Sequence, residues 1–269
     1  MSEPITLMKN QRECADFAIE KARIFNNGDP GTGKTISSLA GYTENASGRL
    51  LVLAPLSILR PSWGNDIDKA YPDWSWAVAH GSPKKRQDAF DSGASIILIN
   101  HDGVKWIADQ LDQGNPLLDN FSHCVVDEYT AFKNRTTARS KAALRVVQAI
   151  PNLMMLSGTP NSNKITDIWF PSFMVDQGKR LGASFYKFQE QVCTGEPIPG
   201  ATSPFARNWI EKDTSRDLVA QLLMDVTIRH ELEGVPINTT QYMHVEMPAS
   251  VMRQYKTLEK DAELVLSTG

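Results

Sequence analysis

"NNGDPGTGKTISSL", residues 26–39, decides the fold, because it places a glycine, four further residues and Gly-Lys-Thr between a strand-like and a helix-like run. This pattern is typical of a loop whose backbone amides turn inward on phosphate groups, and glycines leave room for that approach. The helix that follows directs its positive end at the same charge. We therefore predict a nucleotide-phosphate site at Gly28, Asp29, Pro30, Gly31, Thr32, Gly33, Lys34 and Thr35.

Two side chains of this loop have expected roles of their own. Lys34 would reach the β- and γ-phosphates, and the Thr35 hydroxyl would ligate magnesium. An idle glycine-rich turn is the alternative, and the flanking strand and helix disfavour it. Kinases, transporters, GTPases and DNA motors all share such a loop, so the reaction must be inferred from residues downstream.

"VVDEYTAFKN", residues 125–134, is an apolar strand that ends in two acids. Asp127 would hold magnesium through water, and Glu128 would polarise the attacking water. The alternative is that Asp127 caps the next helix and Glu128 is solvated. Because the pair follows the phosphate loop in chain order and ends a core-like strand, we predict Lys34, Asp127 and Glu128 as the catalytic residues, with Thr35 and Asp127 on magnesium.

A third segment, "LSGTPNSN" at residues 156–163, also leaves an apolar strand. Its hydroxyls, glycine and proline are all turn formers, so an ordinary turn explains it equally well from the residues alone.

Apolar runs alternate with helix-length segments up to residue 158. Most runs are apolar at consecutive positions, which is typical of strands buried on both faces. The alternation predicts an α/β fold, a mostly parallel sheet covered by helices on both faces, with ligands at the carboxyl ends of the strands. The expected strands are "ARIFNN", "LLVLAP" (50–55), "WSWAVAH" (74–80), "SIILIN" (95–100), "HCVVDE" (123–128) and "LMMLSG" (153–158).

After residue 160 the pattern is less regular. We expect a loop at "GEPIPGATSP" (195–204), a buried helix at "DLVAQLLMDVTI" (217–228) and a strand at "TTQYMHVEM" (239–247). The last segment predicts a helix with one apolar stripe made by Val251, Tyr255, Leu258, Ala262 and Val265.

Together these segments resemble the superfamily-two helicases, and within them the Swi/Snf-type DNA-translocating ATPases. "DEYTAFKN" resembles that family's Asp-Glu-x-x-x-x-Lys-Asn element, and "SGTPNSN" resembles its coupling motif. "LVLAPLSILRPSW" (51–63) resembles the motif that follows the phosphate loop, and "AHGSPKKR" (79–86) resembles the His-Gly segment. The segments "FYKFQEQV" (185–192) and "TIRHELEGVPINTTQYMHVEMPASVMRQY" (227–255) resemble the part that leads toward the second motor lobe.

The resemblance implies a RecA-like P-loop NTPase lobe that uses ATP and magnesium to move along double-stranded DNA when a second RecA-like lobe is present. It implies that Gln11 reads adenine and that Ser157, Gly158 and Thr159 couple nucleotide state to DNA. The expected organisation is an ATP-binding lobe over 1–180, a helical extension and loop over 181–235, and a last strand with a connector helix over 236–269. The second lobe, with its arginine finger, is expected to be missing from this chain.

Three departures from the family pattern are visible. The loop reads "GDPGTGKT" where eukaryotic members usually have "GLGKT", Tyr129 and Thr130 follow the acids, and "IRHELEG" carries one arginine where paired basic residues are common. They indicate a bacterial or phage member.

DNA contacts require a local basic patch, because the net charge is −3. Residues 129–166 contain no acid and several cations, which predicts phosphate contacts, although a solvated basic helix is the alternative. Phosphate contacts would be independent of base sequence. With the positions that the resemblance adds, the DNA-contact candidates are Ser57, Asn100, His101, Lys133, Asn134 and Arg135.

The remaining composition narrows the setting. Three cysteines without CxxC spacing indicate reduced thiols in a cytoplasmic protein, bacterial or phage-encoded, and no apolar run is long enough to span a bilayer. Two other functions stay open: a P-loop ATPase of another class acting as an oligomer, and a nucleotide-gated DNA-binding adaptor without turnover.

Overall fold

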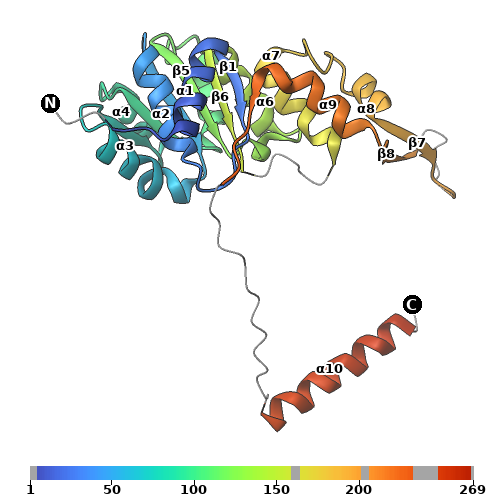
Figure 1. The fold of residues 1–269 in the computed structure, drawn as a ribbon. Coiled ribbons are helices and arrows are strands. Elements are labelled where there is room, and N and C mark those ends of the chain that lie inside the picture. Colours follow the sequence, from blue (N-terminus) through green and yellow to red (C-terminus); the bar gives the residue numbers. More distant parts are fainter. Residues whose placement is uncertain (1–4, 159–163, 201–205, 233–247, 268–269) are drawn as a thin grey trace. The chain divides into compact units, whose positions relative to one another are not determined.

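The computed structural model describes residues 5–158, 164–200, 206–232 and 248–267 (Figure 1). The chain forms two compact units, Met1–Leu232 and Glu233–Gly269. The first unit contains the sheet and every candidate site residue.

Within the described residues, one seven-stranded sheet has the order β3-β4-β2-β5-β6-β1-β9. Every pair of neighbours in it is parallel, which confirms the predicted α/β fold. The strands are β1 (Arg23–Asn26), β2 (Arg49–Ala54), β3 (Trp76–Ala79), β4 (Ile96–Asn100), β5 (Phe121–Asp127), β6 (Asn152–Leu156) and β9 (Thr227–Ile228).

The strands are buried on both faces, as their uninterrupted apolar runs predict. In β2, Leu51 and Leu53 join one core cluster, whereas Leu50 and Val52 join the cluster on the opposite face. The Leu50 cluster includes residues of α1 (Lys9–Lys21), α2 (Lys34–Asn45) and α3 (Asn65–Ala70). The Leu51 cluster includes residues of α4 (Pro83–Asp91), α5 (Gly103–Asp112), α6 (Ala138–Gln148), α7 (Trp169–Asp176), α8 (Phe185–Val192) and α9 (Ser215–Leu223).

Local chemistry fixes where two of these helices begin. Ser82 accepts a hydrogen bond from the Lys85 amide, with Pro83 at the first helical position of α4. Thr137 accepts one from the Ser140 amide at the start of α6. Each cap satisfies one of the amides that the first turn leaves without a helical partner.

Two expectations for the chain after residue 160 are wrong in detail. The helix expected over 217–228 ends at Leu223; a 3-10 turn follows, and Thr227–Ile228 form β9 because they pair with the open edge of β1. The loop expected over 195–204 begins as a strand, since β7 (Cys193–Pro197) pairs antiparallel with β8 (Arg207–Glu211). Gly195 suits that strand because a Cβ there would press on the Trp209 ring at 3.2 Å.

The range 181–235, expected as a helical extension and loop, therefore also contains the three strands β7, β8 and β9. The strand expected at 239–247 lies outside the described residues. In the second unit, the expected C-terminal helix is α10 (Ala249–Ser267), on which Val251, Tyr255 and Leu258 are exposed.

Candidate functional site

The phosphate loop joins the carboxyl end of β1 to α2, as predicted. Gly31 and Gly33 have φ of +88° and +80°, a region that glycine adopts without strain. Gly33 is needed for a second reason, because a Cβ there would overlap the side-chain amide of Gln11. Glycine at this position therefore permits both the left-handed backbone and the close approach of Gln11.

Lys34, the first residue of α2, points back into the loop. Its Nζ donates to the carbonyl oxygens of Gly28 at 2.7 Å and Asp29 at 3.0 Å. Burial lowers the pKa of Lys34, and the negative charges of Asp127, Glu128 and Asp29 oppose that shift. Lys34 thus lies close enough to both predicted acids for their charges to act on it.

Asp127 ends β5 and is held at two points. The buried Trp63 donates its indole N–H to Asp127 Oδ2 at 2.9 Å. The Asp127 carbonyl lies 2.8 Å from His101 Nε2, and because a carbonyl only accepts, Nε2 carries the proton. Burial raises the pKa of Asp127, opposed by the Trp63 hydrogen bond and the Lys34 charge.

Glu128 follows in a left-handed conformation with φ +53° and ψ +56°, which is unusual for a residue with a side chain. Its Oε2 accepts a hydrogen bond from Ser157 Oγ at 3.3 Å. A backbone outlier of this kind costs roughly 1–3 kcal/mol and is characteristic of functional sites. The conformation turns the Glu128 side chain away from the line of β5 and toward the end of β6.

The segment after β6 meets the phosphate loop. The Ser157 amide donates to the Asn26 carbonyl at 3.2 Å. A Cβ on Gly158 would lie 3.0 Å from Pro30 Cγ, so glycine permits the close approach. Ser157 therefore contacts Glu128 and Gly158 lies against the loop, whereas Thr159, the third predicted coupling residue, lies outside the described residues.

Gln11 is buried in α1 directly behind Gly33. Its Oε1 accepts from the Met8 amide at 3.0 Å. A bidentate contact with adenine uses both the oxygen and the nitrogen of the amide, and Oε1 has a second lone pair that can accept from adenine beside the Met8 bond. The predicted role is compatible with this position and stays a prediction.

Several residues that support the loop were missed from the sequence. Tyr129 donates to Asn27 Oδ1 at 3.0 Å. The amides of Asn27 and Asp29 donate at 2.9 Å to carbonyls of residues 228 and 230, and Arg229 pairs with Asp29 at 3.5 Å. These contacts join residues that are far apart in the chain, so no local spacing could have revealed them.

The DNA-contact candidates follow the carboxyl ends of β4, β2 and β5, which are neighbours in the sheet. Ser57, Lys133 and Asn134 are exposed. Asn100 is partly buried and its Oδ1 has no hydrogen-bond partner among the described residues. The His101 ring packs on Phe132 and is committed to Asp127, so its Nε2 is not free for a phosphate.

The basic stretch of the sequence is partly neutralised in space. Lys133 pairs with Asp167 at 3.0 Å, Arg139 with Asp102 at 2.8 Å, and Arg145 with Asp112. Arg135 instead lies over the rings of Phe185 and Tyr186, at 4.5 and 5.0 Å. The absence of acids along 129–166 therefore overstated the local positive charge.

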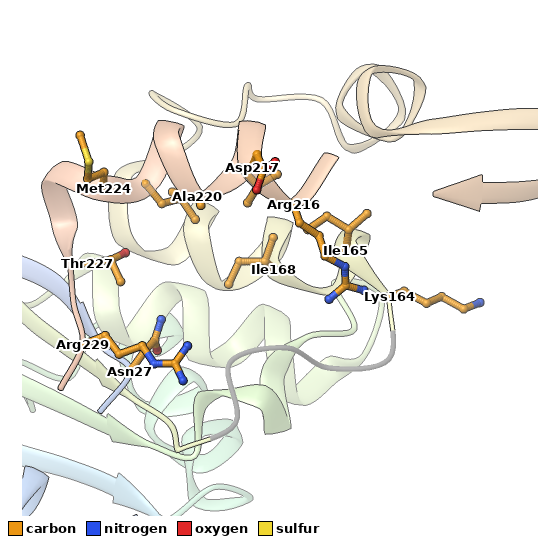
Figure 2. A pocket seen from close by; sticks show the side chains of 12 residues that line it. Asn27, Lys164, Ile165, Ile168, Arg216, Asp217, Ala220, Met224, Thr227 and Arg229 are labelled. Carbon is orange, nitrogen blue, oxygen red and sulfur yellow. The ribbon is translucent and has the colours of Figure 1, made fainter. Parts of the chain in front are cut away.

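A cavity of about 420 Å³ lies beside the loop (Figure 2). It is bounded by the turn Ile165–Ile168, α9 and β9, with Lys164, Arg216 and Arg229 among its polar lining residues, and Asn27 connects it to the phosphate loop. Lys34, Asp127 and Glu128 do not line it. The cavity and the predicted catalytic residues are therefore separate features of the first unit.

The donor set suits a magnesium nucleotide. Magnesium is usually held by one or two carboxylates together with substrate phosphates, and Asp127 with the Thr35 hydroxyl provides those donors. In the described part of the chain, no cluster of three or more His, Cys, Asp or Glu forms a self-contained metal site. The same residues include no helix long and apolar enough to cross a membrane.

The parallel sheet, the glycine loop after β1 and the two acids at the end of β5 define a RecA-like lobe of a P-loop NTPase. The family model of the SNF2-related domain matches residues 11–268, and the chain belongs to this family. The resemblance seen in the sequence is thereby confirmed.

Relatives carry the same domain in longer chains. A protein of Acyrthosiphon pisum secondary endosymbiont phage 1 is 29% identical over 89% of this chain and 54% of its own length. The Xenopus tropicalis SWI/SNF-related matrix-associated actin-dependent regulator of chromatin subfamily A-like protein 1 is 28% identical over 72% of this chain and 20% of its own length. This chain thus spans about half, or less, of these relatives.

A solved structure has the same fold. The Sulfolobus solfataricus SWI2/SNF2 ATPase core in complex with dsDNA superposes with a TM-score of 0.63 at 22% identity, over 84% of this chain and 45% of that one.

Proposed function

We propose that this chain is the ATP-binding motor lobe of a Swi/Snf-like DNA-dependent ATPase. Joined to a second RecA-like lobe, it hydrolyses ATP with magnesium in order to move along duplex DNA. Membership of the SNF2-related family supports the proposal, and the geometry around Lys34 carries it.

That geometry is the convergence of Lys34, Asp127 and Glu128 at one sheet edge. Lys34 Nζ already donates to two carbonyls of the loop, and phosphate oxygens would replace these acceptors. The exchange gains charge-assisted hydrogen bonds, so Lys34 acts mainly on binding of the nucleotide.

The acids have different tasks in the proposed reaction. Asp127 and Thr35 hold magnesium, which when bound neutralises charge on the β- and γ-phosphates. Glu128 orients and polarises the attacking water, and Ser157 shares its carboxylate through the 3.3 Å hydrogen bond. The Ser157 amide also donates a hydrogen bond to the Asn26 carbonyl. A movement of the Glu128 side chain would therefore be passed through Ser157 to the residues that precede the loop.

Duplex DNA is the proposed track. The Sulfolobus core of the same fold is described in complex with dsDNA, and Ser57 and Asn134 are exposed polar residues in the segments that follow the neighbouring strands β2 and β5. Polar side chains of this kind bind phosphates without reading bases.

Substitution of the two key residues tests the proposal. Lys34→Ala should lose ATP binding, because Lys34 interacts with the negative charge that the phosphates of ATP already carry in the ground state. Glu128→Gln should retain binding and lose hydrolysis in the two-lobed protein, because Glu128 acts in the chemical step. Equilibrium binding of a fluorescent ATP analogue and phosphate release are the measurements.

Lys141→Ala and Glu190→Gln are matched controls at exposed positions on α6 and α8. Normal turnover in the Glu128→Gln protein would contradict the assignment of the general base. Undiminished ATP binding by the Lys34→Ala protein would contradict the nucleotide site itself.

A further inference from the structure

The feature that the proposed reaction leaves unexplained is the hydrogen bond between Trp63 and Asp127. Trp63 is fully buried, with 0% of its surface exposed. It packs in the core cluster that contains Leu59 and Ile67, yet its indole N–H points out of that cluster to Asp127 Oδ2 at 2.9 Å. A buried indole N–H requires an acceptor, and here the acceptor is the acid assigned to the metal.

The main chain of Asp127 is fixed independently of Trp63. Parallel pairing sets it opposite Leu156 of β6, and His101 donates to its carbonyl at 2.8 Å. These contacts are made by the main chain and do not hold the side-chain carboxylate. The Trp63 bond engages Oδ2 and restricts the torsions of that side chain, and the Glu128 amide also interacts with the carboxylate.

Trp63 is also closely packed. It lies in a short π-helix, Leu59–Gly64, which follows the turn Leu56–Ile58 after β2. The next residue is Gly64, where a Cβ would lie 2.6 Å from Trp76 Cη2. The end of the π-helix is therefore packed tightly against Trp76, the first residue of β3. Short π-helical segments are frequent at functional sites, and this one delivers a donor to the end of β5.

We propose that Trp63 is a positioning residue that orients the Asp127 carboxylate for magnesium. The proposal rests on the function proposed above, in which Asp127 holds the metal. Residues that hydrogen-bond a metal-ligating carboxylate typically change metal affinity by 10–100-fold when they are removed. Trp63 acts through Asp127 and has no assigned contact with the nucleotide.

Trp63→Phe removes the N–H and keeps an aromatic ring. The probe is N-methylanthraniloyl-ATP, with its anisotropy followed on the 269-residue chain in EDTA and then across a magnesium titration. We expect the variant to need about tenfold more magnesium for half of the magnesium-dependent change in anisotropy. Its affinity for the nucleotide in EDTA should stay within about twofold of that of the unmodified chain. An unchanged magnesium midpoint would overturn the positioning role.

Trp76→Phe is a matched control. Trp76 also donates its indole N–H to a carboxylate, Asp68 Oδ1 at 2.7 Å, and its ring packs on the same turn through Gly64. It has no contact with Asp127. If both variants shift the magnesium midpoint equally, packing of the turn explains the effect and the proposal fails.

A second measurement needs no substitution of Trp63. The chain is labelled with ¹⁵N at its indole nitrogens, and the NMR signal of each indole N–H is recorded. Trp→Phe changes assign the signals of the other tryptophans, and the remaining signal belongs to Trp63. We expect magnesium added to the nucleotide-loaded chain to move the Trp63 signal and leave that of Trp76 in place; a stationary Trp63 signal would refute the proposal. If the unmodified chain binds nucleotide no better with magnesium than in EDTA, and no better than its Lys34→Ala variant, the proposed function fails instead.

Discussion

Asp127 and Gln11 show how much one residue depends on partners from other elements. Asp127 takes its orientation from Trp63 and His101, which follow two different strands. Gln11 belongs to α1, but its amide lies against Gly33 of the phosphate loop and its oxygen caps its own helix. The role of each residue therefore depends both on its own side-chain chemistry and on the neighbouring residues that hold it in place.

Gln11 provides a test of base choice. Gln11→Ala should weaken ATP binding by about 1–3 kcal/mol, because the groups that adenine presents would lose their partners. The loss should be smaller for GTP, so the ATP-to-GTP preference should narrow in competition binding. Gln148→Ala, at an exposed position of α6, is the control.

Removal of Gln11 also takes away packing behind Gly33. This loss would weaken the binding of ATP and of GTP to the same extent. The ratio of the two affinities separates the two effects. Equal affinity of the unmodified chain for ATP and GTP would contradict the adenine assignment.

At the scale of elements, β5 is the central strand that carries the acids, and it contains a buried histidine. His123 is 3% exposed, lies edge-on to Tyr42 of α2 and shares a 2.8 Å hydrogen bond with Ser122. Burial lowers the pKa of His123 to about 4. At neutral pH the strand therefore packs against α2 with a neutral imidazole.

This strand should make the fold sensitive to acid. The unfolded chain takes up the His123 proton near its ordinary pKa of about 6.5, well before the folded chain, so stability is lost as pH falls from there toward 4. Between pH 7.5 and 5.0 we expect His123 to account for about 2 kcal/mol of the fall in unfolding free energy. Urea unfolding at both pH values is the measurement.

His123→Phe should reduce this pH dependence, whatever its effect on absolute stability. His80→Asn, at an exposed position before α4, is the control. An unchanged difference between the two pH values in the His123→Phe protein would show that the buried imidazole does not set the acid sensitivity.

At the scale of the whole molecule, the chain covers 45% of the Sulfolobus core chain and 54% of the phage relative. In the proposed function the nucleotide cleft is completed by a second lobe. Phosphoryl transfer depends on positioning and charge stabilisation, and an arginine finger contributes roughly 10³–10⁵ in rate. A cleft open to water also weakens each electrostatic contact.

We therefore expect the 269-residue chain alone to hydrolyse ATP barely above background, with little stimulation by DNA. Adding the second lobe, covalently or in trans, should restore DNA-stimulated turnover. Phosphate release with and without duplex DNA measures both, with the Lys34→Ala chain as the background. Strong DNA-dependent hydrolysis by the lone chain in monomeric form would contradict this expectation.

The sequence by itself determined the α/β class, the phosphate loop and the acids that end β5, because these are local patterns: glycine spacing, apolar runs and polar residues at strand ends. It did not determine β9, the β7–β8 hairpin, the Trp63–Asp127 bond or the ion pairs that neutralise the basic stretch. Only the tertiary structure decided these features. Thr227–Ile228 becomes a strand because β1 offers an open edge, and Arg139 is neutralised by Asp102 because α5 and α6 pack together. Such contacts depend on which elements the sheet order makes neighbours, and that information is not contained in any local stretch of the chain.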